Sequence, residues 1–571
     1  MRFDSPDTWT PAQARWLAAS VAVVLYLASI GFGFTLDDPA VALENPAVRC
    51  GEVGRLFSTP YHYGPRQRAE TGLYRPVTTA SFAANHAVHG ATPWGFHAEN
   101  VLLHGCASVL VLEVALAAGL AVPGSLVAAL LFAAHPVHVE AVASISGRAD
   151  LLATTCFLLA LLAWIRLRRP SGEPSAAGAL LAAALSLLAM LSKEHATAFP
   201  AVAAAWEVLR PGGAMPAETG RRAARRTLLS IAALLLPLAA YLGLRFAALG
   251  RLLPGPGAVT PIENPLSALG FLERLPSAVA VAGRYAVLLV FPRTLSPDYS
   301  FAEIEPVASV LDPYLLVGIA GIGLACAAVV LARRKAPLLA FAAVFALAVF
   351  FPVSNLAVPI GTVMAERLLY LPSAGLCLAA GMLWGPIARR LGPRGAVAAL
   401  GAVLVVASVR TVAASVVWRD DFALASHAAG ASPRSVKSLG NLAVELAVRG
   451  RSGEALDLLG RALALAPDFW PNRINLSGVL LSTGDLEGAE AQVARVLEAD
   501  PANPSALLQR SVVLEKKGDL AGAEASARAA VAAAPWLGEA HLRLAALLSS
   551  SGRSVEAETE RLAAEVPACG D

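Results

Sequence analysis

Residues 467–500 read PDFWPNRINLSGVLLSTGDLEGAEAQVARVLEAD, and this stretch is one unit of a repeat with a period of 34 residues. Four kinds of position keep their phase from unit to unit: Pro433, Pro467, Pro501 and Pro535; Gly450, Gly484, Gly518 and Gly552; Ala455, Ala489, Ala523 and Ala557; and the small residues Ala443, Ser477, Ser511 and Ala545. Small residues let two helices pack closely, glycine opens the turn between them, and proline follows a helix end. The C-terminal part of the chain is therefore predicted to be a stack of helix pairs, an α-solenoid.

This period and pattern are typical of tetratricopeptide (TPR) repeats, with about four repeats in residues 418–571. Arrays of such helix pairs form a concave surface that can bind a peptide or a protein. The same repeats also serve as spacers or oligomerisation units, and the pattern does not identify a ligand.

Before residue 418 the composition changes to that of a membrane domain. The chain of 571 residues has a mean hydropathy of +0.60 and 15% charged residues, whereas soluble globular proteins have about 25%. Residues 1–417 are therefore predicted to form a bundle of membrane-spanning helices. A net charge of +3, with arginines scattered over loops, argues against a nucleic-acid partner. The six cysteines have no metal-ligand spacing, and a disulfide between Cys50 and Cys569 stays open.

The membrane domain contains apolar runs that are long enough to span, eleven of which are predicted to cross. They are 13–34, 97–120, 122–142, 150–167, 176–192, 195–209, 227–249, 313–332, 336–352, 368–388 and 395–416. The first run lacks a small-residue cleavage site and is predicted to be a retained helix. A further run, 274–291, is interrupted by Arg284 and bordered by prolines.

Short loops rich in arginine and lysine set the orientation, because such loops stay cytoplasmic. The clusters are Arg166 to Arg169, Arg221 to Arg226, Arg333 to Lys335 and Arg389 to Arg394. All four clusters and the N-terminus lie inside if 274–291 does not cross but lies in the interface or re-enters. Eleven crossings then place the repeat array outside. Arginine far outnumbers lysine and alanine is abundant, which is typical of a GC-rich genome and favours a bacterial source. In a bacterium, this topology corresponds to the inner membrane, with the array in the periplasm.

Several charged motifs fall on the outer side of this topology, although they were not used to set it. They are Asp37-Asp38, Tyr74-Arg75-Pro76, His135 to Glu140, Arg148 with Asp150, Lys193-Glu194-His195, Asp298-Tyr299 and Glu366-Arg367. A charge within a spanning helix costs about 2.5–3.5 kcal/mol, so this gathering predicts a composite site at the outer face. Each motif also has a structural interpretation, as a solvated loop start, an interfacial anchor or an ion pair at a helix end.

Carboxylates and fixed cations in one site suit the transfer of a group from a phosphate. Cations hold the phosphate and stabilise it as a leaving group, and a carboxylate takes the proton from an acceptor hydroxyl. Neither GxxxxGK[ST] nor a strand-flanked GxGxxG is present, which favours a lipid-borne phosphate over a soluble nucleotide. His135 and His138, three residues apart and near Glu140, have the spacing of half a metal site, yet no metal ion is required or implied by these residues.

The motifs as a set resemble one protein family. They are TLDDP (35–39), LYRPVT (73–78), PWGFHAEN (93–100), HPVHVEAV (135–142), SGRAD (146–150), LSKE (191–194), LSPDYS (295–300) and AERLLYLPS (365–373). Over residues 30–380, with the TPR tail following, the chain is similar to the transmembrane and TPR repeat-containing (TMTC) O-mannosyltransferases. The resemblance implies a C-type glycosyltransferase (GT-C) architecture, with an active site at the outer face and a polyprenyl-phosphate sugar as donor. In that superfamily an acid in the first outer loop carries catalysis, which points to Asp37 or Asp38.

The hypothesis is therefore an inverting transfer of a hexose such as mannose to a hydroxyl of a periplasmic protein or glycan, with the TPR repeats recruiting the acceptor. Asp37 or Asp38 is the predicted base. The predicted phosphate clamp is Arg75, Arg148, Lys193 and Arg367, and the residues predicted to orient the site are His135, His138, Glu140, Asp150, Glu194 and Glu366. No cofactor is required, and the partners are the lipid-linked donor, membrane lipid and a protein or peptide in the TPR groove.

Two other functions are compatible with parts of the pattern. The first is a membrane-anchored TPR scaffold whose glycosyltransferase half is inactive. The second is a transporter, which would favour charges deep in several helices and paired half-length segments. The unusual charges lie at helix ends on one side, which argues against a transporter.

Overall fold

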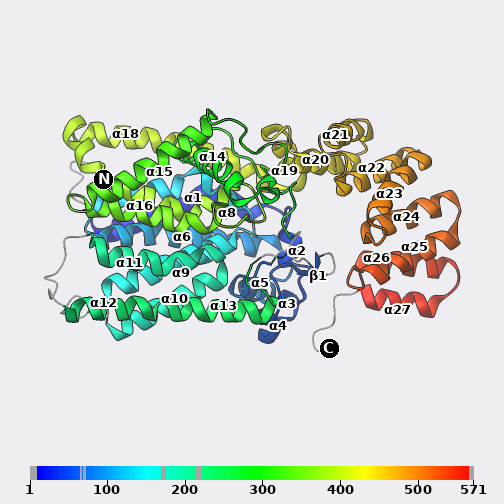
Figure 1. The fold of residues 1–571 in the computed structure, drawn as a ribbon, viewed down its shortest axis with the longest axis horizontal. Helices are drawn as coiled ribbons and strands as arrows, with labels where there is room; N and C mark the ends of the chain where they lie inside the picture. Colours follow the sequence, from blue (N-terminus) through cyan, green and yellow to red (C-terminus); the bar gives the residue numbers. More distant parts are fainter. Residues whose placement is uncertain are drawn as a thin grey trace.

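The computed structural model describes residues 9–64, 67–68, 72–168, 175–211, 221–253, 255 and 258–564. Within these ranges the regular elements are helices, joined by loops, and one short hairpin in which β1 (Tyr63–Gly64) pairs antiparallel with β2 (Gln67–Arg68). A bundle of long helices continues directly into a curved array of helix pairs (Figure 1). The predicted fold class, an all-α membrane helix bundle followed by a TPR solenoid, is confirmed.

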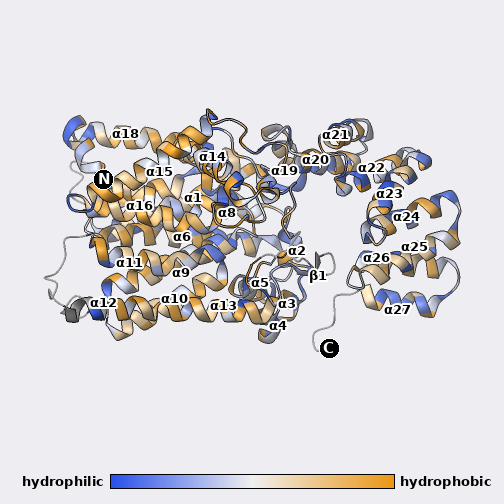
Figure 2. Cartoon of the chain, viewed as in Figure 1, coloured by the Kyte–Doolittle hydropathy of each residue, from blue (hydrophilic) through white to orange (hydrophobic). Residues whose placement is uncertain are grey.

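Apart from α12, which begins with four arginines in six residues, the long helices of the bundle are apolar along most of their length, in contrast to the mixed surface of the array (Figure 2). Their bounds are α1 Pro11–Tyr26, α6 Pro93–Ala117, α7 Val122–Ala134, α9 Arg148–Arg166, α10 Ala176–Ser192, α11 Phe199–Leu209, α12 Arg221–Ala233, α13 Leu235–Leu249, α14 Phe271–Val290, α15 Pro313–Ala332, α16 Pro337–Phe350, α17 Tyr370–Met382 and α18 Trp384–Ser415.

Short helices gather at the end of the bundle that faces the array, which we call the outer end (Figure 1). They are η2 Leu27–Gly31, α2 Asp38–Ala42, α3 Pro46–Cys50, α4 Val53–Ser58, α5 Pro76–His89, η3 Pro136–His138, α8 Val139–Ala143, η4 Glu194–Ala198, η5 Pro265–Ala268, η6 Phe351–Val353 and η7 Glu366–Leu369. Most of the sequence motifs lie in these elements, because proline and charged residues interrupt the apolar helices there.

The predicted spans differ in length from the helices. Within the described residues, six helices are long and apolar enough to cross a membrane, or seven if α7 and the segment Pro136–Ala143, bent by 52°, form one span. The predicted runs 176–192, 195–209, 336–352 and 368–388 correspond to the shorter helices α10, α11, α16 and α17. At a rise of about 1.5 Å per residue, such helices do not by themselves cover about 30 Å of hydrocarbon. The count of eleven crossings therefore stays a prediction.

Helix α14, which covers most of the run 274–291, contacts segments of the outer end near both of its ends. Near its start, Arg274 donates to the carbonyl of Ala357 at 2.9 Å. Near its end, the carbonyl of Leu289 lies 2.9 Å from Nε2 of His135. Helix α14 is not among the candidate spans. This arrangement fits the prediction that the segment lies along one face without crossing.

The described part of the tail consists of η8 (Val416–Arg419), α19 (Asp421–Ala431) and four helix pairs. The pairs are α20 Val436–Val448 with α21 Ser452–Leu465, α22 Trp470–Thr483 with α23 Leu486–Ala499, α24 Pro504–Lys517 with α25 Leu520–Ala533, and α26 Gly538–Ser550 with α27 Ser554–Ala564. The four phased glycines have φ between 75° and 89°, a conformation that suits glycine between two helices. The four phased alanines of the second helices are completely buried.

The cysteines of the described residues fall into two groups. Cys106, Cys156, Cys326 and Cys377 lie in the bundle helices as free thiols. Cys50 is disulfide-bonded, and Cys569, the partner suggested by the sequence, lies outside the described residues.

Candidate active site at the outer end of the bundle

Three ion pairs bring the charged motifs together at the outer end. They are Arg75 with Glu194 at 2.9 Å, Lys193 with Asp150 at 2.6 Å, and Arg367 with Glu140. Each pair joins segments that are distant in the chain, and Arg367 and Glu140 are separated by 227 positions. The helix ends that carry these residues meet because their helices pack side by side. These charged residues therefore lie together in space, and their role as a site stays a prediction.

The three cations differ in how open they are. The side chain of Arg367 is 35% exposed, that of Arg75 is 13% exposed and that of Lys193 is 5% exposed. Burial lowers the pKa of Lys193 to about 8, although the neighbouring carboxylate of Asp150 favours the charged form. Arg367 and Arg75 are therefore the cations that an incoming anion can reach most directly.

The adjacent acids Asp37 and Asp38 occupy different environments. Asp38 is completely buried, and its carboxylate accepts hydrogen bonds from the backbone N–H groups of Thr35 at 3.1 Å and Ser146 at 2.8 Å. Burial raises the pKa of Asp38 to about 6, although these N–H donors act in the opposite direction. Asp38 thus ties the first outer loop to the loop before α9.

Asp37 is exposed at the start of α2, and its side chain forms no hydrogen bond or ion pair with another described residue. Its charge nevertheless acts on the cluster. Burial works against the charged form of Arg367, and nearby carboxylates, including Asp37, raise the pKa of that guanidinium. Asp37 is therefore the open carboxylate of the two, with a cation nearby.

Tyr61 and His62 belong to this cluster, although no motif in the sequence singled them out. Burial lowers the pKa of His62, and the charges that act on its imidazole come from Asp37, Arg75, Arg367 and Glu194. The guanidinium of Arg75 lies 5.0 Å from the centroid of the Tyr61 ring. A tyrosine and a histidine in a polar loop form no periodic or charged pattern, so the sequence does not place them in the cluster. Only the folded loop brings them close to the cations.

Several buried polar atoms in this region lack a hydrogen-bond partner among the described residues. They are the Tyr61 hydroxyl, Nδ1 of His62, Oδ1 of Asp150 and Nε2 of His195. Buried polar groups in native proteins are nearly always satisfied by protein, water or ligand. These four atoms near the ion pairs can therefore each take a hydrogen bond from water or from a bound polar group.

Glu194 links Arg75 to a further cation that the sequence did not indicate. Burial acts to raise the pKa of Glu194, but Arg75 and then Arg245 lower it to about 2. Arg245, from α13, lies 4.0 Å from Glu194 and donates to the carbonyl of Gly72 at 2.6 Å. Glu194 therefore stays ionised and pairs with Arg75 through two nitrogens of the guanidinium.

Arg148 is placed differently from the other predicted clamp residues. It is completely buried between the rings of Phe82 and Phe96. Its guanidinium donates to Asn100, Asn85, Glu99 and the carbonyl of Phe96 at 2.5–2.8 Å. Because these acceptors occupy its guanidinium, Arg148 has a structural role here and is not placed to bind a phosphate. Of the predicted clamp residues, Arg75 and Arg367 are the more exposed.

His135 and His138 form hydrogen bonds within the bundle. The ring of His138 lies 2.8 Å from both the carbonyl of Phe132 and the hydroxyl of Ser373, and His135 contacts Leu289 on α14. These contacts hold the bend between α7 and α8, and Glu140 lies in the first turn of α8. Within the described ranges, no three His, Cys, Asp or Glu side chains come together in a group that could hold a metal ion.

Glu366, beside Arg367, connects the cluster to the repeat array. It is 3% exposed, and its Oε1 accepts from the backbone N–H of Ser296 at 2.7 Å and from the Tyr299 hydroxyl at 2.5 Å. Ser296 in turn contacts the hydroxyl of Ser432 at 2.8 Å. Asp298, from the same motif, accepts hydrogen bonds from Ser435 and Ser438 in the first TPR helix pair. The LSPDYS motif is thus the joint between bundle and array.

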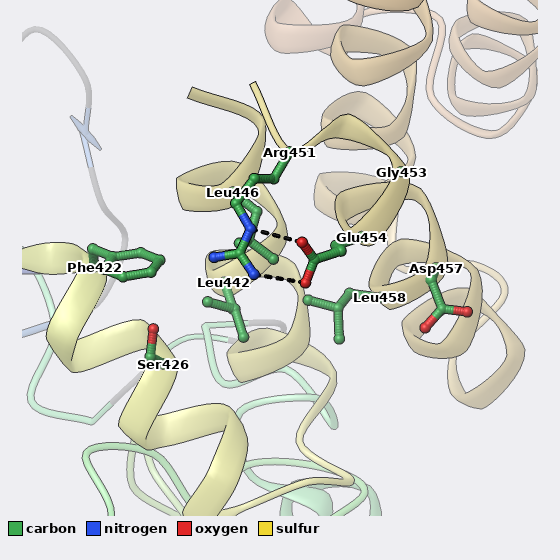
Figure 3. A pocket seen from close by; sticks show the side chains of 9 residues that line it. All are labelled: Phe422, Ser426, Leu442, Leu446, Arg451, Gly453, Glu454, Asp457 and Leu458. Atoms are coloured by element: carbon green, nitrogen blue, oxygen red, sulfur yellow. Dashed lines mark hydrogen bonds and ion pairs between the residues drawn. The ribbon is translucent and has the colours of Figure 1, made fainter. Parts of the chain in front are cut away.

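The array carries a pocket of about 450 Å³ between α19, α20 and α21 (Figure 3). Apolar side chains such as Phe422, Leu442 and Leu458 form part of its wall, and the ion pair between Arg451 and Glu454 closes one side. This pocket lies in the first helices of the array and not among the charged residues of the bundle, so it does not belong to the cluster described above.

Comparisons with known proteins agree with both halves of the chain. A family model described as tetratricopeptide repeat matches residues 449–510. Protein O-mannosyl-transferase TMTC4 of Homo sapiens is 31% identical over 495 residues, which cover 78% of this chain and 65% of the relative. The mouse protein of the same name is 30% identical over 496 residues, covering 79% and 66%. Protein O-mannosyl-transferase Tmtc2 of Drosophila melanogaster is 35% identical over 309 residues, covering 51% and 31%.

The chain therefore spans just under two thirds of the length of its TMTC4 relatives. Among solved structures, a crystal structure of MamA aligns with 25% of this chain and 82% of its own length, at 16% identity and a TM-score of 0.21.

Proposed function

We propose, from the premise that this chain is a homologue of the TMTC family of protein O-mannosyltransferases, that it is a membrane glycosyltransferase. The proposed reaction moves a hexose such as mannose from a polyprenyl-phosphate donor to a hydroxyl of a protein or glycan outside the cytoplasm. The repeat array recruits the acceptor. One observation carries the proposal: Asp37 is an open carboxylate whose charge acts on the partly exposed Arg367, at an end of the bundle where buried polar atoms such as Nδ1 of His62 have no partner among the described residues.

The proposed mechanism assigns one role to each open group. Asp37 takes the proton from the acceptor hydroxyl as the oxygen attacks the anomeric carbon. The bond from that carbon to the phosphate oxygen breaks, and polyprenyl phosphate leaves. Arg75 and Arg367 stabilise the charge that develops on the phosphate, with Lys193 behind them. A single displacement with one base inverts the anomeric centre. No step requires a metal ion.

A lipid-linked donor suits the place of the site. The cluster lies at the end of an apolar bundle, so a headgroup held at the membrane surface reaches it while its chain stays in lipid. Helices α12 and α18, which carry two of the arginine-rich segments, reach the end of the bundle away from the array (Figure 1), which supports an extracytoplasmic site. A disulfide at Cys50, at the outer end, fits an oxidising compartment.

The direct test is Asp37→Asn, assayed in membranes with a labelled polyprenyl-phosphate hexose. Loss of the general base should lower transfer by about 10²- to 10⁴-fold. Asp312→Asn is the matched control, because Asp312 is an acid before α15 that caps the helix by accepting from Leu315 N–H at 2.9 Å, and an amide oxygen can do the same. Undiminished transfer by Asp37→Asn would overturn the assignment of the base. Undetectable transfer by the wild type with any hexose would favour the inactive-scaffold function.

A further inference from the structure

The repeat array contacts the first outer loop directly beside Asp37. The backbone N–H of Leu36 donates to Oδ1 of Asp421 at 3.0 Å, across 385 positions of sequence. Asp421 is the first residue of α19, the helix that leads into the repeats. The residue that follows Leu36 is Asp37, so a side chain of the array is bonded one peptide unit away from the proposed base.

Leu36 has a backbone conformation that needs outside support. Its φ is +49°, in the left-handed region, and its side chain is 48% exposed. A residue with a side chain seldom adopts this conformation, and it persists where surrounding contacts fix it, often at functional sites. Because the exposed leucine side chain gains little from packing, the hydrogen bond to Asp421 is a principal contact that can hold this turn.

The rest of the segment is held by other groups. The Gly33 N–H donates to the carbonyl of Arg419 at 3.1 Å, and the Gly33 carbonyl lies 3.2 Å from Nε2 of His97. Thr35 is bonded to Asp38 through its backbone N–H and its hydroxyl. These contacts fix the ends of the turn, and Asp421 fixes its middle residue.

Asp421 is not needed for the ordinary task of an acid at a helix start. The N-cap of α19 is Asp420, whose Oδ1 accepts from the N–H of Ala423 at 2.7 Å. Two neighbouring acids therefore divide two tasks: Asp420 caps the helix, and Asp421 reaches across to the catalytic loop. This division supplies a matched pair of positions for an experiment.

We propose that Asp421 is a positioning residue for the transfer reaction, holding Leu36 in the strained turn that presents Asp37. The proposal rests on the proposed role of Asp37 as the base. It makes the beginning of the repeat array a part of the catalytic scaffold, in addition to any role of the array in binding an acceptor. The array and the active site then cannot move independently at this joint.

The test compares Asp421→Ala, Asp421→Asn and Asp420→Ala in the full-length protein. Asp421→Ala removes the acceptor for Leu36 and should lower kcat by about tenfold or more, because a misplaced base is costly, while the KM for the lipid-linked donor stays within about twofold. Asp421→Asn keeps an oxygen in place and should restore kcat to within about threefold of the wild type. Asp420→Ala weakens the same helix through its cap and should leave kcat within about twofold.

Hydrogen exchange of the peptide covering residues 33–38 provides a readout that does not depend on catalysis. Asp421→Ala should exchange faster in this peptide than the wild type, and Asp420→Ala should not. Unchanged exchange in Asp421→Ala, or an equal loss of kcat in both alanine variants, would overturn the proposal. If exchange responds as expected but the wild type transfers no hexose, the proposed function fails while the structural role of Asp421 stands.

Discussion

At the residue scale, burial separates side chains that look alike in the sequence. Asp37 and Asp38 are neighbours, yet Asp38 is enclosed by hydrogen-bond donors and Asp37 is open. Arg148 and Arg75 both belong to motifs with nearby acids, yet Arg148 is saturated with acceptors inside the protein. A charge in a motif therefore becomes a candidate for chemistry only if the fold leaves some of its hydrogen-bonding capacity free.

The buried carboxyl of Glu366 should make the stability of the fold depend on pH. Burial, followed by the charge of Glu140, raises the pKa of Glu366 from 4.5 to about 8. Between those values the folded protein holds a proton that the unfolded chain has lost, so this group stabilises the fold below pH 4.5 and the contribution is lost as the pH rises through 8. Glu366→Gln removes the titration while keeping an oxygen for Ser296 and Tyr299. The thermal unfolding midpoint in detergent should therefore fall less between pH 5 and pH 9 in this variant than in the wild type.

Glu273→Gln is the control for that measurement. Glu273 is an exposed glutamate whose Oε2 accepts from the N–H of Gly270 at 3.0 Å, and an amide oxygen can replace it. The wild-type pH dependence should persist in Glu273→Gln. If Glu366→Gln followed the wild-type curve as well, the carboxyl of Glu366 would not carry the raised pKa.

At the element scale, the orientation of the chain depends on α14. This helix packs against α15 so closely that a Cβ at Gly283 would lie 1.9 Å from the carbonyl oxygen of Tyr314. Its polar contacts, at Arg274, Tyr285 and the Leu289 carbonyl, are all to segments of the outer end. These contacts are those expected if this 20-residue helix lies at the outer end and adds no crossing.

We therefore predict that both ends of α14 are accessible from the same side. In separate variants, Glu273→Cys and Arg293→Cys should react with a membrane-impermeant maleimide in intact cells, because both positions are exposed at the outer end. Arg334→Cys should react only after permeabilisation, because its arginine-rich loop is expected inside. The wild type measures the background from its native thiols. Opposite accessibility of positions 273 and 293 would show that α14 crosses, and the orientation of every later helix would reverse.

At the scale of the whole molecule, the array is joined to the bundle through its first helices and curves past the outer end through the later ones (Figure 1). Asp421 and the serines bonded to Asp298 lie in residues 421–438, whereas α24 to α27 contact mainly their neighbours in the array. Repeat arrays are stabilised between neighbouring units, so terminal units can be removed without unfolding the others.

We predict that deleting residues 502–571 separates catalysis from recruitment. Transfer to a small hydroxyl acceptor should stay within about twofold of the wild type, because the joint at Asp421 and Asp298 is retained. Transfer to a protein acceptor should fall by about tenfold or more if half of the binding surface is lost. The full-length Cys569→Ser variant controls for the cysteine that the deletion removes. An equal fall with both acceptors would contradict a separate recruiting role for the outer repeats.

The sequence alone determined the two kinds of helix in this protein. The period of 34 residues predicts the helix pairs, because the constraints at Gly484 and Ala489 are local to each unit and its neighbour. The apolar runs predict the bundle, because lipid demands continuous hydrophobicity. The apolar runs do not determine where each helix ends. Charged motifs such as Lys193-Glu194 end the helices early, so several helices are shorter than the length needed to span the membrane.

The tertiary structure decided which charges are free. Packing between distant segments, which no local pattern encodes, pairs Arg367 with Glu140 and buries Arg148. The same packing brings Tyr61 and His62 into the charged cluster. The contact between Asp421 and Leu36 is the clearest case, because a hydrogen bond across 385 positions exists only when the array folds back against the outer loop. The periodic pattern of a helix reflects the geometry of its own backbone, so the sequence alone reveals it. The site is formed by side chains from different elements, so only their packing reveals it.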